Sequence, residues 1–194
     1  MLDEPLAALD SYLRWQIEPE LGDILARFGG PAVWVSHDRG EIYRSCEQVC
    51  VLTEGRSAPV RGVKELMADP RTASAARLSG CENYVSVRPG REPWTVDVPE
   101  WGLTLAASWR TGVTTLGIRQ VRLAGEGAED TFFCRVLRVT EDVSFMRVTL
   151  RPEGAREDAP TLRMELDKEA WAALPDKTRV QVAVRAEDLL LLEE

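Results

Sequence analysis

The chain has 194 residues, of which 44% are hydrophobic, and this is enough for one or two domains with a sizeable core. Its 32 acidic residues outnumber its 24 basic residues and give a formal net charge of -8 at pH 7. Because a net negative charge opposes attraction to a phosphate backbone, the composition argues against nucleic acid as a partner.

The cysteines and the hydrophobic pattern exclude two further classes. Cys46, Cys50, Cys81 and Cys134 form no C-x-x-C pair, and with a single histidine they rule out the usual Cys/His zinc clusters. We expect reduced structural thiols in a cytosolic protein. No apolar run approaches the roughly 18 residues that a membrane-spanning helix needs, and the first residues show no signal-peptide pattern. Any membrane role is therefore expected to act through a partner.

A first helix is predicted after Asp10, a favourable N-cap residue. Apolar residues recur at helical spacing until Gly29-Gly30-Pro31 ends the pattern: Leu13, Ile17, Leu21, Ile24, Leu25 and Phe28. Pro19 lies inside this helix, and an interior proline costs roughly 3 kcal/mol. We therefore expect a kink or a break near Glu18.

Two short apolar runs follow, at residues 32–36 and 48–52, with a polar, helix-compatible stretch at 38–46 between them. Strands that alternate with helices predict βαβ units and a parallel sheet buried on both faces. A turn at Gly55-Arg56 and a short helix from Val63 to Asp69-Pro70 complete the region. We expect a first domain of α/β class over residues 1–80.

From residue 81 the pattern changes to short segments of alternating polarity separated by turns. These segments lie at residues 95–98, 103–105, 133–139, 146–150, 162–166 and 180–184. Many short runs with a period of two predict a barrel or a sandwich. Residues 81–194 are therefore expected to form a second, mainly β domain.

This second domain contains a faint internal repeat. Residues 116–123, Leu-Gly-Ile-Arg-Gln-Val-Arg-Leu, resemble residues 182–189, Val-Ala-Val-Arg-Ala-Glu-Asp-Leu, with Arg119 and Arg185 in register. Chance alternation can also produce such a match. A duplicated small barrel is the interpretation that we favour.

The first residues carry the clearest chemistry. In Leu2-Asp3-Glu4-Pro5, an apolar residue leads into two carboxylates, as when a strand presents one to Mg²⁺ and one to a water that attacks a phosphate. His37, the only histidine, ends the second apolar run. Taken alone, Asp3 can be a helix N-cap and His37 a structural, hydrogen-bonded histidine. The end of a strand is, however, where α/β sheets present functional side chains, which favours the catalytic interpretation.

The order and spacing of three segments resemble those of ABC transporter ATPases. Asp3-Glu4-Pro5 resembles Walker B, Ala8-Leu9-Asp10 the D-loop, and Ser36-His37-Asp38 the H-loop. Residues 9–16, 35–44 and 75–83 look like the ATP-binding subunit of molybdate or sulfate importers, and the molybdate type is the more similar of the two. The resemblance implies the distal part of a P-loop ATPase nucleotide-binding domain over residues 1–80.

The resemblance also implies roles for four residues. Asp3 would hold Mg²⁺ through water, Glu4 would be the general base, His37 would orient the attacking water, and Asp10 would belong to the D-loop that crosses to the other ATPase subunit. ATP and Mg²⁺ are therefore the cofactors expected for the full-length protein. The chain contains no Gly-x-x-x-x-Gly-Lys-Ser/Thr and no Q-loop, and Leu78-Ser79-Gly80 lies downstream of Walker B, unlike a signature loop. We expect the C-terminal portion of a longer subunit, without tightly bound ATP and inactive alone.

Residues 81–194 are similar to the TOBE regulatory domain of such subunits, an OB-like barrel, and include its Gly117-Ile118-Arg119 segment. The family implies subunit contacts and, in some members, binding of the transported oxyanion. The Ser-Ala-Arg-Asn-like turn of the family pocket is not found here. Arg119, Arg135 and Arg185 can supply positive charge, but solvated arginines are the simpler interpretation.

Two tryptophans, Trp94 and Trp101, flank Pro99 in the β region. Such a pair can stack on a ligand, but paired aromatic residues in a β domain usually belong to the core or to an interface. We expect both tryptophans to pack in the core.

The leading hypothesis is a portion of the ATPase subunit of an importer for molybdate, tungstate or sulfate. The full protein would be a homodimer on the cytoplasmic face of the membrane, bound to two permease subunits. One alternative is a non-enzymatic module that senses an oxyanion or dimerises, and another is an importer subunit for a polyamine or a sugar. Because an unprotected strand edge invites pairing, we also expect self-association or a partly disordered first domain.

Overall fold

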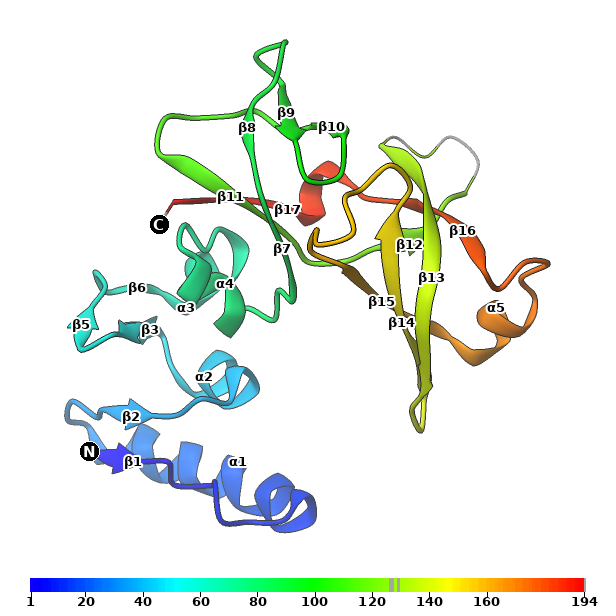
Figure 1. The fold of residues 1–194 in the computed structure, drawn as a ribbon. Helices are drawn as coiled ribbons and strands as arrows, with labels where there is room; N and C mark the ends of the chain where they lie inside the picture. The colour runs from blue at the N-terminus through cyan, green and yellow to red at the C-terminus, as the bar shows by residue number, and fades with distance from the viewer. Residues whose placement is uncertain (126–127, 129, 194) are drawn as a thin grey trace. The chain divides into compact units, whose positions relative to one another are not determined.

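The computed structural model describes residues 1–125, 128 and 130–193, and the chain divides into two compact units, Met1–Asp69 and Pro70–Glu194 (Figure 1). We call them unit 1 and unit 2. The predicted boundary at residue 80 falls eleven residues after this division, because helix α4 (Ala73–Leu78) belongs to unit 2. Its Ala76 is buried together with Cys81, Leu190 and Leu192.

Unit 1 begins with a strand, a helix and a second strand that pairs parallel to the first. Strands β1 (Leu2–Asp3) and β2 (Trp34–Val35) are joined by helix α1 (Ser11–Phe28). The Asp10 carboxylate accepts a hydrogen bond from the Leu13 N–H at 2.9 Å, and Gly29 ends the helix with φ +66°. The predicted N-cap and helix stop are therefore confirmed. A parallel βαβ unit is present, but it joins β1 and β2 through α1 and not the two runs at 32–36 and 48–52 for which it was predicted.

The expected break near Glu18 is wrong, because α1 continues across Pro19 as one helix (Figure 1). Glu18, the residue before the proline, is held by a side chain from another helix. Arg44, on helix α2 (Arg39–Ser45), donates two hydrogen bonds to the Glu18 carboxylate at 2.7 and 2.8 Å. This contact holds the middle of α1 against α2, and helical periodicity alone does not reveal it.

The remainder of unit 1 corrects the prediction of a larger parallel sheet. Strand β3 (Gln48–Val49) pairs antiparallel with β6 (Arg61–Gly62), and β4 (Leu52–Thr53) pairs antiparallel with β5 (Arg56–Ser57). Within the described residues, β1 and β2 form a sheet of their own. The β4–β5 pairing follows from the turn at Glu54 and Gly55, whose φ values of +51° and +73° suit a two-residue hairpin that returns the chain.

The last element of unit 1 is helix α3 (Val63–Ala68). It matches the short helix predicted before Asp69-Pro70. Its residues Val63 and Leu66 are buried.

Unit 2 is mainly β. Its strands are β7 (Asn83–Ser86), β8 (Arg88–Pro89), β9 (Thr95–Val98), β10 (Leu103–Ala106), β11 (Val113–Ile118), β12 (Arg122–Leu123), β13 (Thr131–Glu141), β14 (Phe145–Pro152), β15 (Leu162–Asp167), β16 (Arg179–Ala183) and β17 (Leu189–Glu193). Helix α5 (Lys168–Ala172) and a 3-10 turn (Ala186–Asp188) interrupt them. The six segments predicted from alternation lie on strands, apart from Val184, which follows the end of β16, and this confirms the mainly β character.

The strands of unit 2 form three sheets among the described residues, with the orders β10-β9-β8, β17-β11-β7 and β12-β16-β13-β14-β15. Their inner faces enclose one core, whose largest fully buried side chain is Trp101. The indole N–H of Trp101 donates to the Pro160 carbonyl at 2.8 Å. Trp94, in contrast, is 60% exposed, so its predicted place in the core is wrong. Trp94 precedes β9 instead of lying on a buried strand face.

The two copies of the faint repeat exchange strands. The first copy covers the end of β11 and β12, and the second covers the end of β16 and the start of β17. Strand β11 pairs antiparallel with β17, and β12 pairs antiparallel with β16. A duplicated strand-turn-strand unit related by a twofold axis would give this reciprocal pairing.

Gly117 lies on β11 where side chains of neighbouring segments pack against its backbone. A Cβ atom there would lie 3.0 Å from the Cys81 Sγ and 3.2 Å from the Leu192 Cδ1. The Gly117-Ile118-Arg119 segment therefore has a packing reason for its glycine.

All four cysteines are free. Burial raises the pKa of the Cys81 thiol, and it raises the pKa of Cys134 to about 12. Cys81 and Cys134 are buried, as structural thiols require, whereas Cys50 is exposed.

None of the helices formed by the described residues combines the length and the apolar character needed to cross a bilayer.

Candidate functional site

The parallel pairing of β1 and β2 places the residues after both strands at one edge. The Leu2 N–H donates to the Val33 carbonyl at 2.8 Å, and the Glu4 N–H donates to the Val35 carbonyl at 2.9 Å. Because the carboxyl ends of parallel strands meet at the same edge, Glu4 and the segment from Ser36 to Asp38 are brought together.

The closest contact at this edge joins Glu4 and His37. The His37 Nδ1 lies 2.7 Å from the Glu4 Oε1, and the imidazole is 81% exposed. The hydrogen bond to Glu4 raises the pKa of His37 above its ordinary value, and the negative charge of Glu4 adds to this effect. The pair therefore favours a protonated Nδ1 that donates to the carboxylate, while the other ring nitrogen is left for a further partner.

The backbone at Glu4 adopts an uncommon conformation. Its φ is +45°, in the left-handed region that non-glycine residues seldom adopt, and Pro5 follows it. Leu6, two residues later, is 1% exposed and anchors the turn after β1. Strain of this kind persists where the surrounding structure fixes it, and it is common at functional sites.

A second cluster supports the end of β2. The Asp38 carboxylate accepts hydrogen bonds from the Gly40 N–H at 2.7 Å and the Glu41 N–H at 3.1 Å, and thereby caps α2. The same carboxylate contacts the Arg14 guanidinium of α1 at 3.0 Å. The backbone hydrogen bond from Glu41 is the main cause of the lowered pKa of Asp38. Asp38 therefore joins α1 to α2 immediately after His37.

Glu41 belongs to the same cluster and is almost completely buried. Its carboxylate accepts a hydrogen bond from the Ser36 hydroxyl at 2.7 Å and lies 3.8 Å from Arg14. The Ser36 hydroxyl in turn accepts from the Asp38 N–H at 3.0 Å. These contacts fix the backbone on both sides of His37.

Sequence reasoning missed Glu41 and Arg14. The spacing Asp38-x-x-Glu41 is the pattern of a capping box and is the signal that points to Glu41. No comparable local signal marks Arg14, because its role depends on how α1 packs against α2.

Asp3 and Asp10 lie outside the Glu4–His37 pair. Asp3 is exposed at the end of β1, and Asp10 caps α1. In the part of the chain that the structure describes, no hydrogen bond or ion pair joins either residue to Glu4 or His37, and no group of three metal-ligating side chains is formed. Of the four predicted site residues, the structure brings two together.

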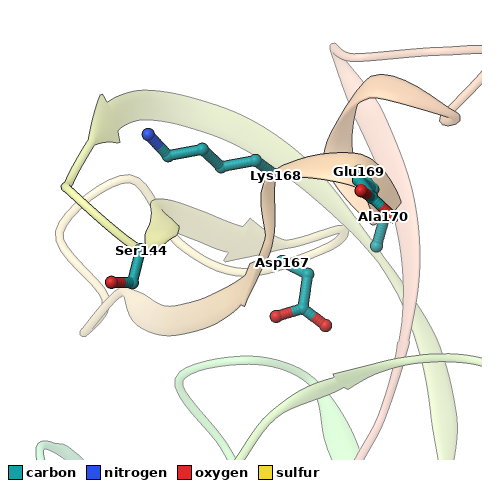
Figure 2. Close-up of a pocket in the computed structure, with 5 residues that line it drawn as sticks. All are labelled: Ser144, Asp167, Lys168, Glu169 and Ala170. Atoms are coloured by element: carbon teal, nitrogen blue, oxygen red, sulfur yellow. The ribbon is translucent and has the colours of Figure 1, made fainter.

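Unit 2 contains a hollow of about 470 Å³ between the β13–β14 turn and the start of α5 (Figure 2). Its lining residues are Ser144, Asp167, Lys168, Glu169 and Ala170. Figure 2 shows Lys168 and Asp167 extending in different directions. The Lys168 ammonium donates to the Glu141 carboxylate at 2.7 Å. With two carboxylates and a lysine that is already paired, this open hollow lacks the convergent groups of a catalytic site.

The three arginines considered for anion binding lie on separate elements. Arg119 follows β11, and its backbone N–H donates to the Asp188 backbone carbonyl at 2.9 Å. Arg185 precedes the 3-10 turn and lies 3.4 Å from the Glu187 carboxylate. Arg135 is exposed on β13.

Comparison with known proteins identifies the relatives of the chain. No known family profile matches the chain. Its homologues are ATP-binding subunits of ABC transporters of the import type.

The Fe(3+) ions import ATP-binding protein of Streptomyces avermitilis is 34% identical over 205 aligned residues, which cover 99% of this chain and 54% of the relative. The sulfate/thiosulfate import ATP-binding protein of Chromobacterium violaceum is 33% identical over 165 residues, with 79% of this chain and 43% of the relative covered. The spermidine/putrescine import ATP-binding protein of Pseudomonas fluorescens is 25% identical over 181 residues, with 84% and 49% covered. The chain thus spans about half the length of the curated relatives that it matches.

Proposed function

We propose that this chain supplies the distal part of the nucleotide-binding domain and the regulatory domain of the ATP-hydrolysing subunit of an ABC importer. The observation that carries the proposal is the contact of 2.7 Å between Glu4 and His37 at the carboxyl ends of β1 and β2. The import ATP-binding proteins among its homologues support the same class. Residues 1–80 would serve the ATPase, and residues 81–194 would form the TOBE domain.

In this proposal Glu4 is the general base. Its carboxylate accepts a proton from the water that attacks the phosphate, and a positioned base contributes about 10²- to 10⁴-fold in rate. His37 holds this carboxylate through its Nδ1 and keeps its other nitrogen and its exposed face available to the phosphate. The cluster of Ser36, Asp38 and Glu41 fixes the backbone of His37.

The exposed carboxylate of Asp3 has the hard oxygen donors that Mg²⁺ prefers, and it suits a contact through water. ATP with Mg²⁺ would supply the phosphoryl group and the neutralisation of its charge. Asp10, which caps α1, would present the D-loop to a second ATPase subunit.

The 194 residues include no glycine-rich phosphate loop with its lysine, so we expect the purified chain to lack magnesium-dependent ATP turnover. The exposed apolar side chains of unit 1 support packing against a further protein surface, which we assign to the portion of the ATPase domain that carries this loop. Those side chains include Tyr12, Trp15, Ile24, Phe28 and Val33.

We propose an oxyanion as the transported substrate, either molybdate, tungstate or sulfate. The sulfate/thiosulfate import relative supports this class. The Fe(3+) import relatives, one of which aligns with 99% of the chain, favour ferric iron as the second candidate. The subunit would act as a homodimer, bound to permease subunits at the cytoplasmic face of the membrane.

A chimera tests the ATPase assignment. The segment of the Streptomyces avermitilis relative that precedes its alignment with this chain is joined to Met1, and magnesium-dependent phosphate release is measured with the parent chimera, with Glu4→Gln and with His37→Ala. We expect Glu4→Gln to lower turnover by about 10²-fold or more while nucleotide binding is retained. Equal turnover by the parent chimera and Glu4→Gln would contradict the assignment.

Calorimetric titration of the 194-residue chain tests the alternative of an oxyanion sensor. Molybdate, tungstate and sulfate are the ligands, and the transporter proposal needs no binding by this chain alone. Binding at about 1 µM would favour a non-enzymatic sensing module.

A further inference from the structure

The five-stranded sheet of unit 2 has two chemically different faces. Its inner face contributes Cys134, Val148, Leu150, Met164 and Val182 to the core. Because side chains alternate along a strand, the residues between them lie on the outer face. This outer face carries six arginines from four neighbouring strands: Arg135, Arg138, Arg147, Arg151, Arg163 and Arg179. Arg138 belongs to this face because the register shifts between Val136 and Arg138, which places Arg138 opposite Thr149.

Strand register places three of these arginines in one row. Arg135 on β13 lies directly opposite Arg179 on β16 and directly opposite Arg151 on β14. The next row on this face joins Arg138, Thr149 and Arg163. Like charges placed directly opposite each other on a sheet destabilise it, so rows of this kind call for a counter-charge.

Half of the six arginines have that counter-charge within unit 2. Arg179 donates two hydrogen bonds to Glu153 at 2.7 and 2.9 Å, and Arg147 donates to Glu165 at 2.8 Å. Arg163 lies 3.2 Å from the Glu82 carboxylate.

The other three arginines are Arg135, Arg138 and Arg151. Among the described residues they take part in no ion pair, and the buried Nε of Arg151 makes no hydrogen bond. We call these three residues the unpaired arginine group. They leave a positive region on a chain whose formal net charge is -8.

The layout of the group fits an extended acidic segment. Neighbouring strands lie about 4.8 Å apart, and alternate residues of an extended peptide repeat every 6.8 Å or so. The guanidinium groups are therefore distributed over two rows of a sheet face, in contrast to the convergent donors that enclose a single ion. Carboxylates on alternate residues of an extended chain can pair with them in both rows.

Aromatic rings on the same face support a protein partner. Phe133 is 38% exposed, and the Arg179 guanidinium lies 3.7 Å from its ring centroid. Phe145 lies under Arg147 at 5.3 Å. Arginine and exposed aromatic rings are enriched together where proteins bind proteins.

We propose that the outer face of the β16-β13-β14-β15 sheet binds an acidic segment of a partner protein, whose carboxylates pair with the unpaired arginine group. This function is separate from the chemistry at Glu4 and His37.

The test uses the full 194-residue chain and a fluorescein-labelled peptide of ten glutamates, with fluorescence anisotropy at low ionic strength. The double variant Arg135→Ala/Arg138→Ala removes two charges from the group. Arg91→Ala/Arg185→Ala removes two charges from exposed arginines elsewhere in unit 2 and so has the same net charge. We expect about tenfold weaker peptide binding for the first variant and less than about twofold for the second.

Three results would overturn the proposal. The first is no peptide binding by the parent chain, and the second is an equal loss in both double variants, which would indicate net charge alone. The third is complete displacement of the peptide by inorganic sulfate at an ionic strength where sodium chloride has little effect, which would indicate a small-anion site. We expect instead that peptide binding weakens gradually with either salt and depends only on the ionic strength.

Discussion

The two units differ in how they use their apolar residues. Unit 2 encloses a core in which Trp101, Leu116, Ile118 and Leu150 are fully buried. Unit 1 contains most of the large apolar side chains that the described residues expose, namely Met1, Tyr12, Leu13, Trp15, Ile24, Phe28, Val33, Val35, Tyr43, Leu52 and Val60. Helix α1 buries none of its residues completely.

Different interactions therefore stabilise the two units. In unit 2, burial of apolar surface supplies the main stabilising free energy. In unit 1, α1 is joined to α2 and its N-cap by polar contacts of Arg14, Glu18, Asp38, Glu41 and Arg44. A unit of this kind keeps a large apolar surface for a partner and is stabilised strongly only when that surface is covered.

The largest expected effect contrasts two tryptophans. Trp101→Ala should lower the free energy of unfolding of unit 2 by about 3–5 kcal/mol, because it leaves a cavity and removes the hydrogen bond to Pro160. Trp15→Ala, at a side chain that is 75% exposed, should change stability by less than about 0.5 kcal/mol. Chemical denaturation followed by circular dichroism measures both. Equal losses would mean that Trp15 is buried in solution.

An intermediate effect is expected at Asp38. Asp38→Ala should destabilise unit 1 by about 1–2 kcal/mol, because α2 loses its N-cap and α1 loses the contact with Arg14. Hydrogen exchange of the α2 amides measures the loss, and Asp23→Ala, an exposed carboxylate on α1, is the matched control.

The stabilising contribution of Asp38 should depend on pH. Because folding lowers the pKa of Asp38, its stabilising contribution is present above the ordinary pKa of the group and is lost as the pH falls through the lowered value. The difference between the parent chain and Asp38→Ala should therefore shrink in acid. A difference that stays constant from neutral to strongly acidic pH would contradict the assigned role.

The smallest effect is expected at His37, which gives the only imidazole signal of the chain in NMR. Its pKa should lie above the ordinary value of 6.5, and Glu4→Gln should lower it toward that value. Because folding raises this pKa, the contribution to stability is full below the ordinary value and is lost as the pH rises through the raised one. An unchanged titration in Glu4→Gln would show that the pair does not form in solution. Glu41→Gln, which keeps Glu4 in place, is the comparison.

Much of the fold could be predicted from local patterns. Asp10 and Gly29 mark the ends of α1 because capping depends on residues next to one another in the sequence. Alternation located the strands of unit 2 for the same reason. The pairing of β3 with β6, and the continuation of α1 across Pro19, depend on contacts between distant segments and were missed.

The candidate site shows the same division. Glu4 and His37 are recognisable because an acidic pair after an apolar residue and a histidine after a strand are distinctive. The parallel pairing of β1 and β2 then brings them within hydrogen-bond distance. The role of Arg14 depends on the packing of two helices, and the unpaired arginine group emerges only from strand register. Neither feature can be recognised from the spacing of residues in the sequence.

The reciprocal strand exchange in unit 2 has a consequence for how the protein folds. The β17-β11-β7 sheet is complete only when β11 pairs with β17, which lies about 75 residues further along the chain. Pairings at such separation must overcome a large loss of chain entropy and fold slowly, on a timescale of about milliseconds to seconds. During synthesis, β11 and β12 therefore emerge well before β17 and β16, and each presents an open hydrogen-bonding edge until its later partner arrives. This stage is the one most dependent on protection from aggregation.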